Sequence, residues 1–462
     1  MHDLADYRHH DSVPGHDALR RLAGRVERAL EKNAGKRRVL RLTEPLEQPV
    51  HPLRWLGSQP ASEKVYWSGR EDCSRIAAAG AADMIGTGVP GDCEALGLAE
   101  NALAGSGARY YGGLRFDPDS EPSGRWAEFG AWRFVLPRLE LISGEIGSEL
   151  ACNLSLPRDA ARAGEILTEL YRSPLPAGGP AGELPLPVSR LDSPDRAGWE
   201  LNIGQALSAF ERGELRKAVL ARRAEFGFAG DLDPELLLAN LEAATPGCFH
   251  FGLRPEGGAA FVGASPERLY RREGREVVSE AVAGTLPRGD STESDEALRE
   301  KLLGDDKLLR EHGYVREGLR ESLAGLCEEI EVEEGVSEMK LASRRHLVSG
   351  VRGTLRRGVS DANLLDALSP TPAVGGTPRK EAMRLIQELE PFDRGLYAGP
   401  VGWIGENAAE FAVGIRSGLV DGDRLALYSG NGIVEGSEAE SEWREIEQKI
   451  SDFAAVLGLD LR

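Results

Sequence analysis

The first third of the chain combines one helical pattern with a series of short strand patterns. Residues 18–34 place apolar side chains three and four positions apart, which predicts an amphipathic helix. Short strand-like runs follow, and the one at residues 128–143 alternates aromatic or aliphatic residues with polar ones, as strands with one buried face do. These stretches lie at residues 37–42, 64–69, 109–116, 128–143 and 149–156. Gly-rich turns join them at short spacing, so we expect a large antiparallel sheet system.

A Pro- and Gly-rich stretch at residues 173–197 separates this pattern from the rest, and it predicts a surface connection. After it, residues 201–216 have the pattern of an amphipathic helix that leads into an extended run at residues 217–228. We therefore expect an amino-terminal scaffold half at residues 18–172 and a second region at residues 198–462. Both halves are expected to contribute to one continuous core.

The second region alternates strands with longer helices. Residues 259–270 predict a strand, a turn and a second strand, and residues 295–326 predict a long helical region. The polar start of the chain, residues 1–17, lacks the apolar core of a signal peptide, so we expect a disordered tail there.

Composition limits the classes of function. The chain has 462 residues with a hydrophobic fraction of 41%, which can support a substantial core, and no run of 18 apolar residues predicts a membrane span. The formal net charge of −19 argues against nucleic acid or an anionic membrane as partner. The five cysteines are scattered and include no C-x-x-C pair. This argues against a disulfide scaffold or a zinc site and favours the reducing cytoplasm.

The run from residue 428 to residue 449 carries the strongest candidate chemistry. Gly430, Asn431 and Gly432 predict a tight turn whose bare N–H groups can approach a ligand. In the helical pattern that follows, Glu442, Glu445 and Lys449 share one face. An anion-binding turn beside two carboxylates suggests a hard-metal site shared with an anionic substrate. The alternative is a glycine turn followed by a solvated acidic helix.

This run, YSGNGIVEGSEAESEWREIEQK, resembles the carboxyl-terminal signature of the chorismate-utilising enzymes, which include the isochorismate, salicylate, anthranilate and aminodeoxychorismate synthases. Their signature is A-G-x-G-I-V, then E-x-x-E and a lysine four residues later, and only the first alanine differs, at Ser429. Further motifs match in order between about residues 213 and 457, and the amino-terminal half matches more loosely. They are G-E-L-R-K-A-V-L-A-R, G-A-S-P-E, K-L-L-R-E-H, H-L-V-S-G-V-R-G and P-T-P-A-V-G-G-T-P-R. The resemblance implies an α+β fold with a large two-layered antiparallel β-sheet core flanked by helices.

The resemblance also implies roles for individual residues. Lys217 corresponds to the general base of the water-using members, and Glu267 corresponds to the general acid. Glu311 and Glu445 correspond to the two ligands of Mg²⁺, although Leu308 departs from relatives that carry an acidic residue there. The residues implied to bind the substrate are Gly284, Thr285, His346, Ala373, Arg416, Gly430, Gly432 and Lys449.

The residue types themselves allow a functional and a structural interpretation. Lys217 opens an extended run, where it either projects into a cleft or is a charged strand end. Glu267 follows a turn, where it is either aimed inward or exposed. If buried, its raised pKa would let it hold a proton, whereas a lysine must lose its proton to act as a base. Arg416 lies between apolar neighbours on a buried-looking strand, so it needs an anion, and a carboxylate suits its planar fork.

The activity implied is the Mg²⁺-dependent conversion of chorismate to isochorismate, by addition of water at C2 and loss of the C4 hydroxyl, feeding menaquinone or siderophore synthesis. Ala283 stands where aminodeoxychorismate synthases carry a lysine nucleophile, and the loop around Ala373 favours keeping the enolpyruvyl group. The expected partner is chorismate, and no glutaminase subunit is expected. The alternatives are a salicylate synthase, which adds pyruvate elimination, and an inactive chorismate-binding protein.

Overall fold

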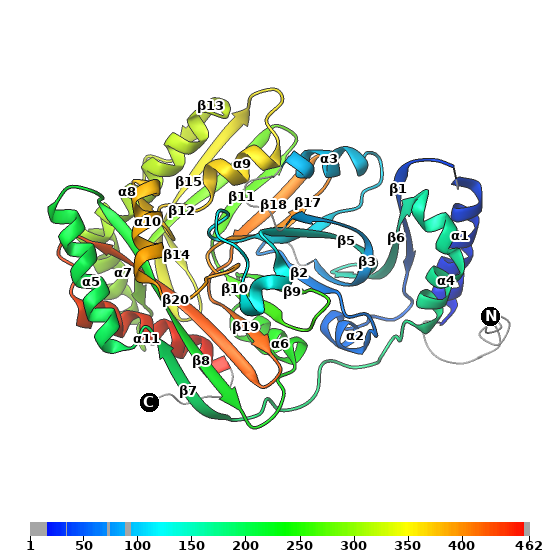
Figure 1. The fold of residues 1–462 in the computed structure, drawn as a ribbon, viewed down its shortest axis with the longest axis horizontal. Helices are drawn as coiled ribbons and strands as arrows, with labels where there is room; N and C mark the ends of the chain where they lie inside the picture. The colour runs from blue at the N-terminus through cyan, green and yellow to red at the C-terminus, as the bar shows by residue number, and fades with distance from the viewer. Residues whose placement is uncertain (1–15, 34, 72–73, 88–93, 457–462) are drawn as a thin grey trace.

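The computed structural model describes residues 16–33, 35–71, 74–87 and 94–456 (Figure 1). The expected disordered tail, residues 1–17, lies almost wholly outside the described residues. The α-helices of the described parts are α1 (His16–Asn33), α2 (Pro52–Ser58), α3 (Glu94–Ala102), α4 (Ala163–Arg172), α5 (Arg196–Glu211), α6 (Pro234–Ala244), α7 (Thr292–Gly304), α8 (Asp306–Ala324), α9 (Asp361–Leu368), α10 (Arg379–Leu389) and α11 (Ala439–Val456).

The strands form one connected sheet of 20 strands in the described parts of the chain, and the pairings between them are antiparallel. The strands are β1 (Arg38–Pro45), β2 (Lys64–Ser68), β3 (Arg75–Thr87), β4 (Tyr110–Leu114), β5 (Trp132–Gly144), β6 (Gly147–Leu156), β7 (Pro187–Ser193), β8 (Lys217–Phe228), β9 (Phe249–Arg254), β10 (Ala260–Ser265), β11 (Arg268–Glu273), β12 (Glu276–Pro287), β13 (Cys327–Val332), β14 (Ser337–Lys340), β15 (Arg344–Leu355), β16 (Gly376–Thr377), β17 (Pro400–Ile404), β18 (Ala408–Val413), β19 (Ser417–Asp421) and β20 (Arg424–Val434). The expected mixed fold with a large antiparallel sheet is confirmed.

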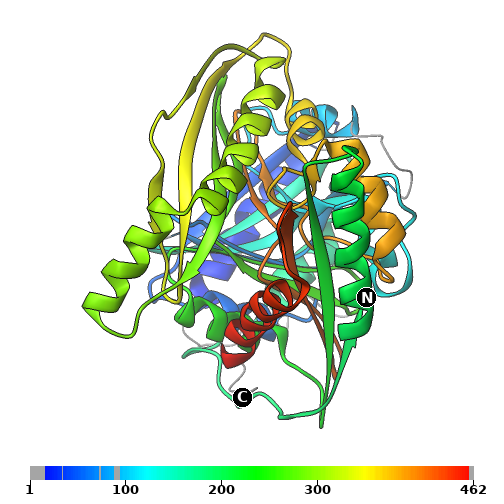
Figure 2. The same cartoon turned by 90° about the vertical axis from the view of Figure 1, so that its left-hand side faces the viewer.

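The sheet divides at β5 into two long branches, and the short pair β6–β1 also joins β5. One branch runs β5–β3–β2–β9–β10–β19–β20–β8, with β7 and β16 paired to β8. The other runs β5–β4–β17–β18–β11–β12–β15, with β13 and β14 paired to β15. Both branches end on the same side of the molecule, where α5, α7, α8, α10 and α11 lie (Figure 1). Helices α7 and α8 lie along β12 and β15 (Figure 2).

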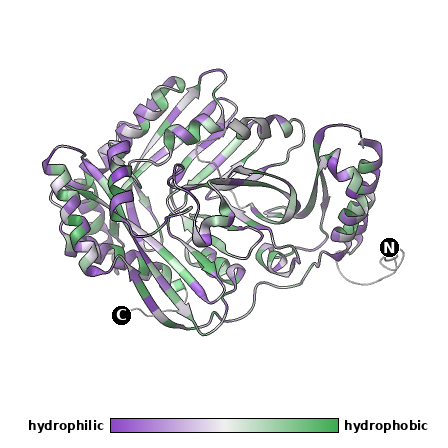
Figure 3. Ribbon diagram, viewed as in Figure 1, coloured by the Kyte–Doolittle hydropathy of each residue, from purple (hydrophilic) through white to green (hydrophobic). Residues whose placement is uncertain are grey.

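Helix α1 confirms the amphipathic pattern at residues 18–34. Leu19, Leu22, Val26 and Leu30 recur at intervals of three and four residues and are all buried. They face β1, β6 and α4 at the end of the molecule opposite the branch ends (Figure 1). Each buried side chain of this size contributes about 1.5–3 kcal/mol to folding. The outer helices accordingly carry both hydrophilic and hydrophobic residues along their length (Figure 3).

Two predicted boundaries differ in the structure. Part of the expected connection at residues 173–197 is strand β7, which pairs with β8 and carries the exposed side chains Val188 and Leu191. An edge strand that exposes apolar residues has no clean alternation, so its pattern resembles a loop. The expected long helix at residues 295–326 is two helices, because Asp305 caps α8 by accepting hydrogen bonds from two backbone N–H groups of its first turn.

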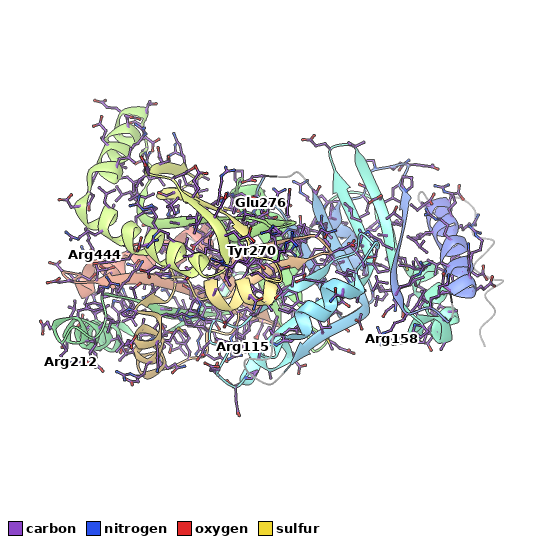
Figure 4. The ribbon with its side chains drawn as sticks, turned by 90° about the horizontal axis from the view of Figure 1, so that it is seen from above. Arg115, Arg158, Arg212, Tyr270, Glu276 and Arg444 are labelled. Atoms are coloured by element: carbon purple, nitrogen blue, oxygen red, sulfur yellow. The ribbon has the colours of Figure 1, made fainter. Side chains whose placement is uncertain are left out.

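Side chains from the two halves of the sequence pack against each other near the middle of the molecule. The rings of Phe134 and Phe411 lie 5.9 Å apart, and those of Trp126 and Phe261 lie 5.5 Å apart. Tyr270 packs on Phe411 with ring centroids 5.3 Å apart, and Figure 4 shows it centrally, far from Arg158 at one end. The branch ends that carry the candidate site therefore rest on a core to which the scaffold half contributes.

Candidate active site

A cavity of about 440 Å³ lies where the branch ends meet α8 and α11. Its size is that of a pocket for a small organic molecule. Eleven of the twelve residues proposed from the sequence line it. They are Glu267, Gly284, Thr285, Glu311, His346, Ala373, Arg416, Gly430, Gly432, Glu445 and Lys449. These residues come from both sheet branches and two helices, so only the tertiary fold brings them together.

The twelfth residue, Lys217, does not itself line the cavity. It is the first residue of β8, is 0% exposed and is absent from the cavity wall. Its Nζ donates to Oε1 of Glu311 at 3.1 Å, and Glu311 does line the cavity. The lysine is therefore directly behind the cavity wall and reaches the cavity through Glu311.

The expected turn at residues 430–432 is also wrong, because Gly430, Asn431 and Gly432 continue strand β20 and pair with β8. The glycines instead make room. A Cβ on Gly432 would lie 2.5 Å from Oε1 of Glu311 and 2.9 Å from Cε of Lys217. No side chain fits there without displacing the Lys217–Glu311 pair, so glycine at this position keeps the pair and the space beside it intact.

Glu267 has the environment expected of a general acid. It lies between β10 and β11, is 4% exposed and lines the cavity. Within the described part of the chain its carboxyl makes no hydrogen bond or ion pair. Burial raises the pKa of Glu267 to about 8, with Glu280 acting in the same direction and Lys217 opposing it. The carboxyl is therefore protonated at neutral pH and can donate a proton.

Arg416 and His346 form the polar end of the cavity. Arg416 does not lie on a strand as expected; it links β18 to β19 with φ of 48°, a region rarely occupied by residues other than glycine. Its Nη2 donates to His346 Nε2 at 2.8 Å, and His346 Nδ1 lies 2.9 Å from Thr285 Oγ1. Burial, and then nearby positive charge, hold the pKa of His346 well below its usual value, so the ring is neutral and accepts from Arg416.

No carboxylate of the described residues forms an ion pair with Arg416, which leaves its charge available for an anion. His346 lies within β15, which begins at Arg344. Opposite it, Gly284 has φ of 74° and interrupts the register between β12 and β15 at Ala283 and Thr285. This bulge turns β12 at the cavity wall, and the conformation suits glycine.

Three carboxylates of the cavity wall each pair with a lysine. Besides Lys217–Glu311, Lys449 Nζ lies 3.0 Å from Oε1 of Glu445, and Lys307 Nζ lies 3.3 Å from Oε1 of Glu442. Lys307 lies on α8, and Glu442, Glu445 and Lys449 lie on α11. Burial acts to raise the pKa of Glu445, but the Lys449 charge and hydrogen bonds outweigh it and leave the pKa below its usual value.

The donor set fits a hard cation such as Mg²⁺. Carboxylate oxygens are its usual protein ligands, and it keeps several waters or substrate oxygens beside them. The described residues contain no group of three or more His, Cys, Asp or Glu side chains arranged to hold a metal. A site built on Glu311 and Glu445 alone would thus complete its shell with water and substrate, in the space that Gly432 keeps free beside Glu311.

Three residues at this site are absent from the set of site residues proposed from the sequence. Glu442 was noted only as one of the two carboxylates on the helix face beside the glycines, yet it is 3% exposed and lines the cavity. Lys307 lies one helical turn before Glu311, but it pairs with Glu442 on α11. Asn431 donates to Oε2 of Glu442 and accepts from Lys449 Nζ at 2.7 Å. Spacing within one helix could not show these contacts between elements.

Comparisons with known proteins agree with the family resemblance that the sequence motifs carry. A family model described as chorismate binding enzyme matches residues 24–458. The chain belongs to the chorismate-binding enzyme family. It is 31% identical to the isochorismate synthase MenF of Escherichia coli over 92% of this chain and 94% of that protein. It is 37% identical to the chloroplastic isochorismate synthase 2 of Arabidopsis thaliana over 76% of this chain and 64% of that protein, so it spans slightly less than two thirds of that plant relative.

A solved structure extends the likeness within this chorismate-binding family to the whole fold. The menaquinone-specific isochorismate synthase MenF of Escherichia coli superposes with a TM-score of 0.82 at 29% identity, over 95% of this chain and 100% of that chain. Among the described residues, none of the helices combines the length and apolar character that crossing a membrane requires. The fold and the family predicted from the sequence are thus both confirmed.

Proposed function

We propose that the protein is an isochorismate synthase that converts chorismate to isochorismate with Mg²⁺. The observation that carries the proposal is that a protonated carboxyl and a lysine are both present at one cavity. Glu267, whose pKa is about 8, lines the cavity, and Lys217 stands behind the wall on Glu311. A hydroxyl exchange needs both an acid and a base, because hydroxide is a poor leaving group and water is a poor nucleophile.

In the proposed reaction Glu267 gives its proton to the C4 hydroxyl, which leaves as water while the ring double bonds shift. A water molecule adds at C2, and Lys217 takes its proton. One proton is given and one is taken, so the enzyme ends each turnover with no net change in protons. Lys217 acts only when neutral and only after its hydrogen bond to Glu311 is exchanged.

Chorismate carries two carboxylates, and the cavity has cationic groups to hold them. Glu311 and Glu445 would hold Mg²⁺, which would neutralise and orient the ring carboxylate. Arg416, whose charge is unpaired among the described carboxylates, would take the other carboxylate at the polar end with neutral His346 beside it. Ala283 lines the cavity and has no nucleophile, so a covalent lysine route is closed to this chain.

The proposal includes the place of the enzyme in the cell. Cys152, Cys248 and Cys327 are free and buried, which agrees with the cytoplasmic location expected from the sequence. The product would feed menaquinone or siderophore synthesis. The loop around Ala373, which lines the cavity, supports release of isochorismate with its enolpyruvyl group attached.

Product identification tests the proposal. The protein is incubated with chorismate and Mg²⁺, with and without ammonium, and the products are separated by chromatography. We expect isochorismate as the main product in both conditions, and chorismate when isochorismate is supplied. Stoichiometric pyruvate would show a salicylate synthase instead, and anthranilate formed with ammonium would contradict the role of Lys217. Binding of chorismate without any product would identify a binding protein.

A further inference from the structure

Arg344 lies at the polar end of the cavity and has no role in the scheme above. It opens β15 two residues before His346, lines the cavity and is only 4% exposed. Its Nε donates to Oδ2 of Asp452 at 2.6 Å, so part of the guanidinium is paired. Its Nη2, however, is buried and has no hydrogen-bond partner in the part of the chain that the structure describes. A buried donor without an acceptor is costly, and a ligand in the cavity can supply the acceptor.

Lys449, which the family resemblance assigns to substrate binding, already has protein partners for its ammonium group. Lys449 Nζ donates to the Gly430 carbonyl at 3.0 Å and to Asn431 Oδ1 at 2.7 Å, and it pairs with Glu445 at 3.0 Å. An ammonium has three donors, so these contacts account for all of them. Lys449 therefore has to give up a partner before it can bind a substrate carboxylate.

Arg344 and Arg416 are better placed to bind an anion together. Both line the cavity, and both act on His346, because burial and then the charges of Arg416 and Arg344 hold the pKa of its ring well below the usual value. One carboxylate has about four lone-pair sites and can accept from two guanidinium groups at once. If Arg416 acted alone, the carboxylate that does not face the metal would be only partly paired in a buried site.

We propose that Arg344 is a second substrate-binding arginine, which donates from Nη2 to the side-chain carboxylate of a cyclic dicarboxylate, alongside Arg416. The identity of that dicarboxylate as chorismate rests on the function proposed above. The competing explanation is structural: Arg344 only ties the start of β15 to α11 through Asp452. The two explanations differ in what happens when Asp452 alone is changed.

The test compares Arg344→Gln with Asp452→Asn as the matched control. Asp452→Asn weakens the tie to α11 but keeps the Nη2 donor of Arg344, whereas Arg344→Gln removes both. Calorimetry with Mg²⁺ present measures binding of 3-(carboxymethoxy)benzoate, which has both carboxylates, and of 3-methoxybenzoate, which has only the ring carboxylate. Steady-state kinetics with chorismate measures KM and kcat separately.

Arg344→Gln should weaken binding of the dicarboxylate about 10- to 100-fold, the usual range for a lost charge-assisted hydrogen bond, and should raise KM for chorismate similarly while kcat changes little. Binding of 3-methoxybenzoate should change less than about twofold. Asp452→Asn removes a negative charge from the cavity wall, so it should weaken neither ligand by more than about twofold. If Arg344→Gln does not fold, Arg344→Lys provides the test. Its single ammonium cannot bind Asp452 and the ligand with the same geometry, so this variant should weaken binding of the dicarboxylate about 3- to 10-fold.

Four results would each overturn the inference. The first two are equal effects of Arg344→Gln on both ligands and the same loss in Asp452→Asn. The others are unchanged dicarboxylate binding in the arginine variants and a parent protein that binds the dicarboxylate no more tightly than the monocarboxylate. Its failure is separable from that of the proposed function. A protein that makes no isochorismate but shows the predicted binding pattern loses only the function, and one that makes isochorismate without that pattern loses only the role of Arg344.

Discussion

Two buried polar clusters, one in the scaffold half and one at the cavity, contain similar residues but differ in how completely their charges are paired. In the scaffold half Arg138 donates two hydrogen bonds to Asp159, at 2.6 and 2.9 Å, and a third to the Asn153 carbonyl. Asp159 also accepts from the Ser155 backbone N–H. Both charged side chains are almost completely buried and are held by several partners. This cluster is closed, because its charges satisfy each other.

The cavity cluster leaves some of its groups open. The Glu267 carboxyl has no hydrogen-bond partner and the Arg416 charge has no carboxylate partner in the described parts of the chain, while the lysine–glutamate pairs line or adjoin a space of about 440 Å³. The comparison shows that buried charge alone does not mark a functional site. Unmatched groups around a cavity do, because a substrate can complete them.

The largest expected effect is on turnover. Lys217→Met or Glu267→Gln should lower kcat about 10²- to 10⁴-fold, since each removes one partner of the proton exchange. Lys64→Met is the matched control, because Lys64 is also buried and pairs with a glutamate, Glu235, at 3.3 Å. Glu235 does not line the cavity, whereas Glu311, the partner of Lys217, does. The folded fraction of the Lys64 variant should keep normal kcat. Near-normal turnover of the Lys217 variant would remove this lysine from the mechanism.

The closed cluster should respond in stability instead. Arg138→Met leaves Asp159 buried without its main partner and should lower the free energy of unfolding by about 3–5 kcal/mol, measured by urea denaturation followed by circular dichroism. The double change Arg138→Met with Asp159→Leu should recover much of the loss. A loss below about 1 kcal/mol, or a lowered kcat in the folded protein, would contradict the division between the two clusters.

The metal ligands should show an effect on affinity. Glu311→Gln or Glu445→Gln should weaken Mg²⁺ binding at least about 10-fold by calorimetry, and excess Mg²⁺ should restore part of the activity. Glu447→Gln is the control on the same helix, since Glu447 pairs with Arg190 and Arg222 and is not in the cavity wall. Unchanged activity of both ligand variants at limiting Mg²⁺ would refute the metal site.

The smallest effect is a pH dependence. The pKa of Glu267 is raised to about 8, so kcat/KM should fall about tenfold per pH unit above that pH as the acid loses its proton. Stability should follow the same group. Because the folded pKa exceeds the unfolded value, the folded state loses stability as pH rises toward 8. Glu267→Gln should therefore be more stable than the parent at pH 9, and the difference should shrink by pH 5; a constant difference would contradict the raised pKa.

The sequence by itself determined the elements and most of the residues around the cavity. The extended run at residues 217–228 is strand β8 with the same bounds, and the apolar spacing of residues 18–34 is helix α1. Local periodicity suffices for this, because it reflects which face of an element is buried. The motifs also selected eleven residues that line one cavity.

Tertiary structure alone decided which of these residues touch. Lys217 lies 94 positions from Glu311, and Lys307 lies 135 positions from Glu442, so no local pattern indicates either pair. The same holds for the buried position of Lys217 and for the strand at Gly430, which looked like a turn because glycine suits both a turn and a close contact between strands. Contacts between distant segments depend on how the two branches of the sheet come together, and that is a property of the whole fold.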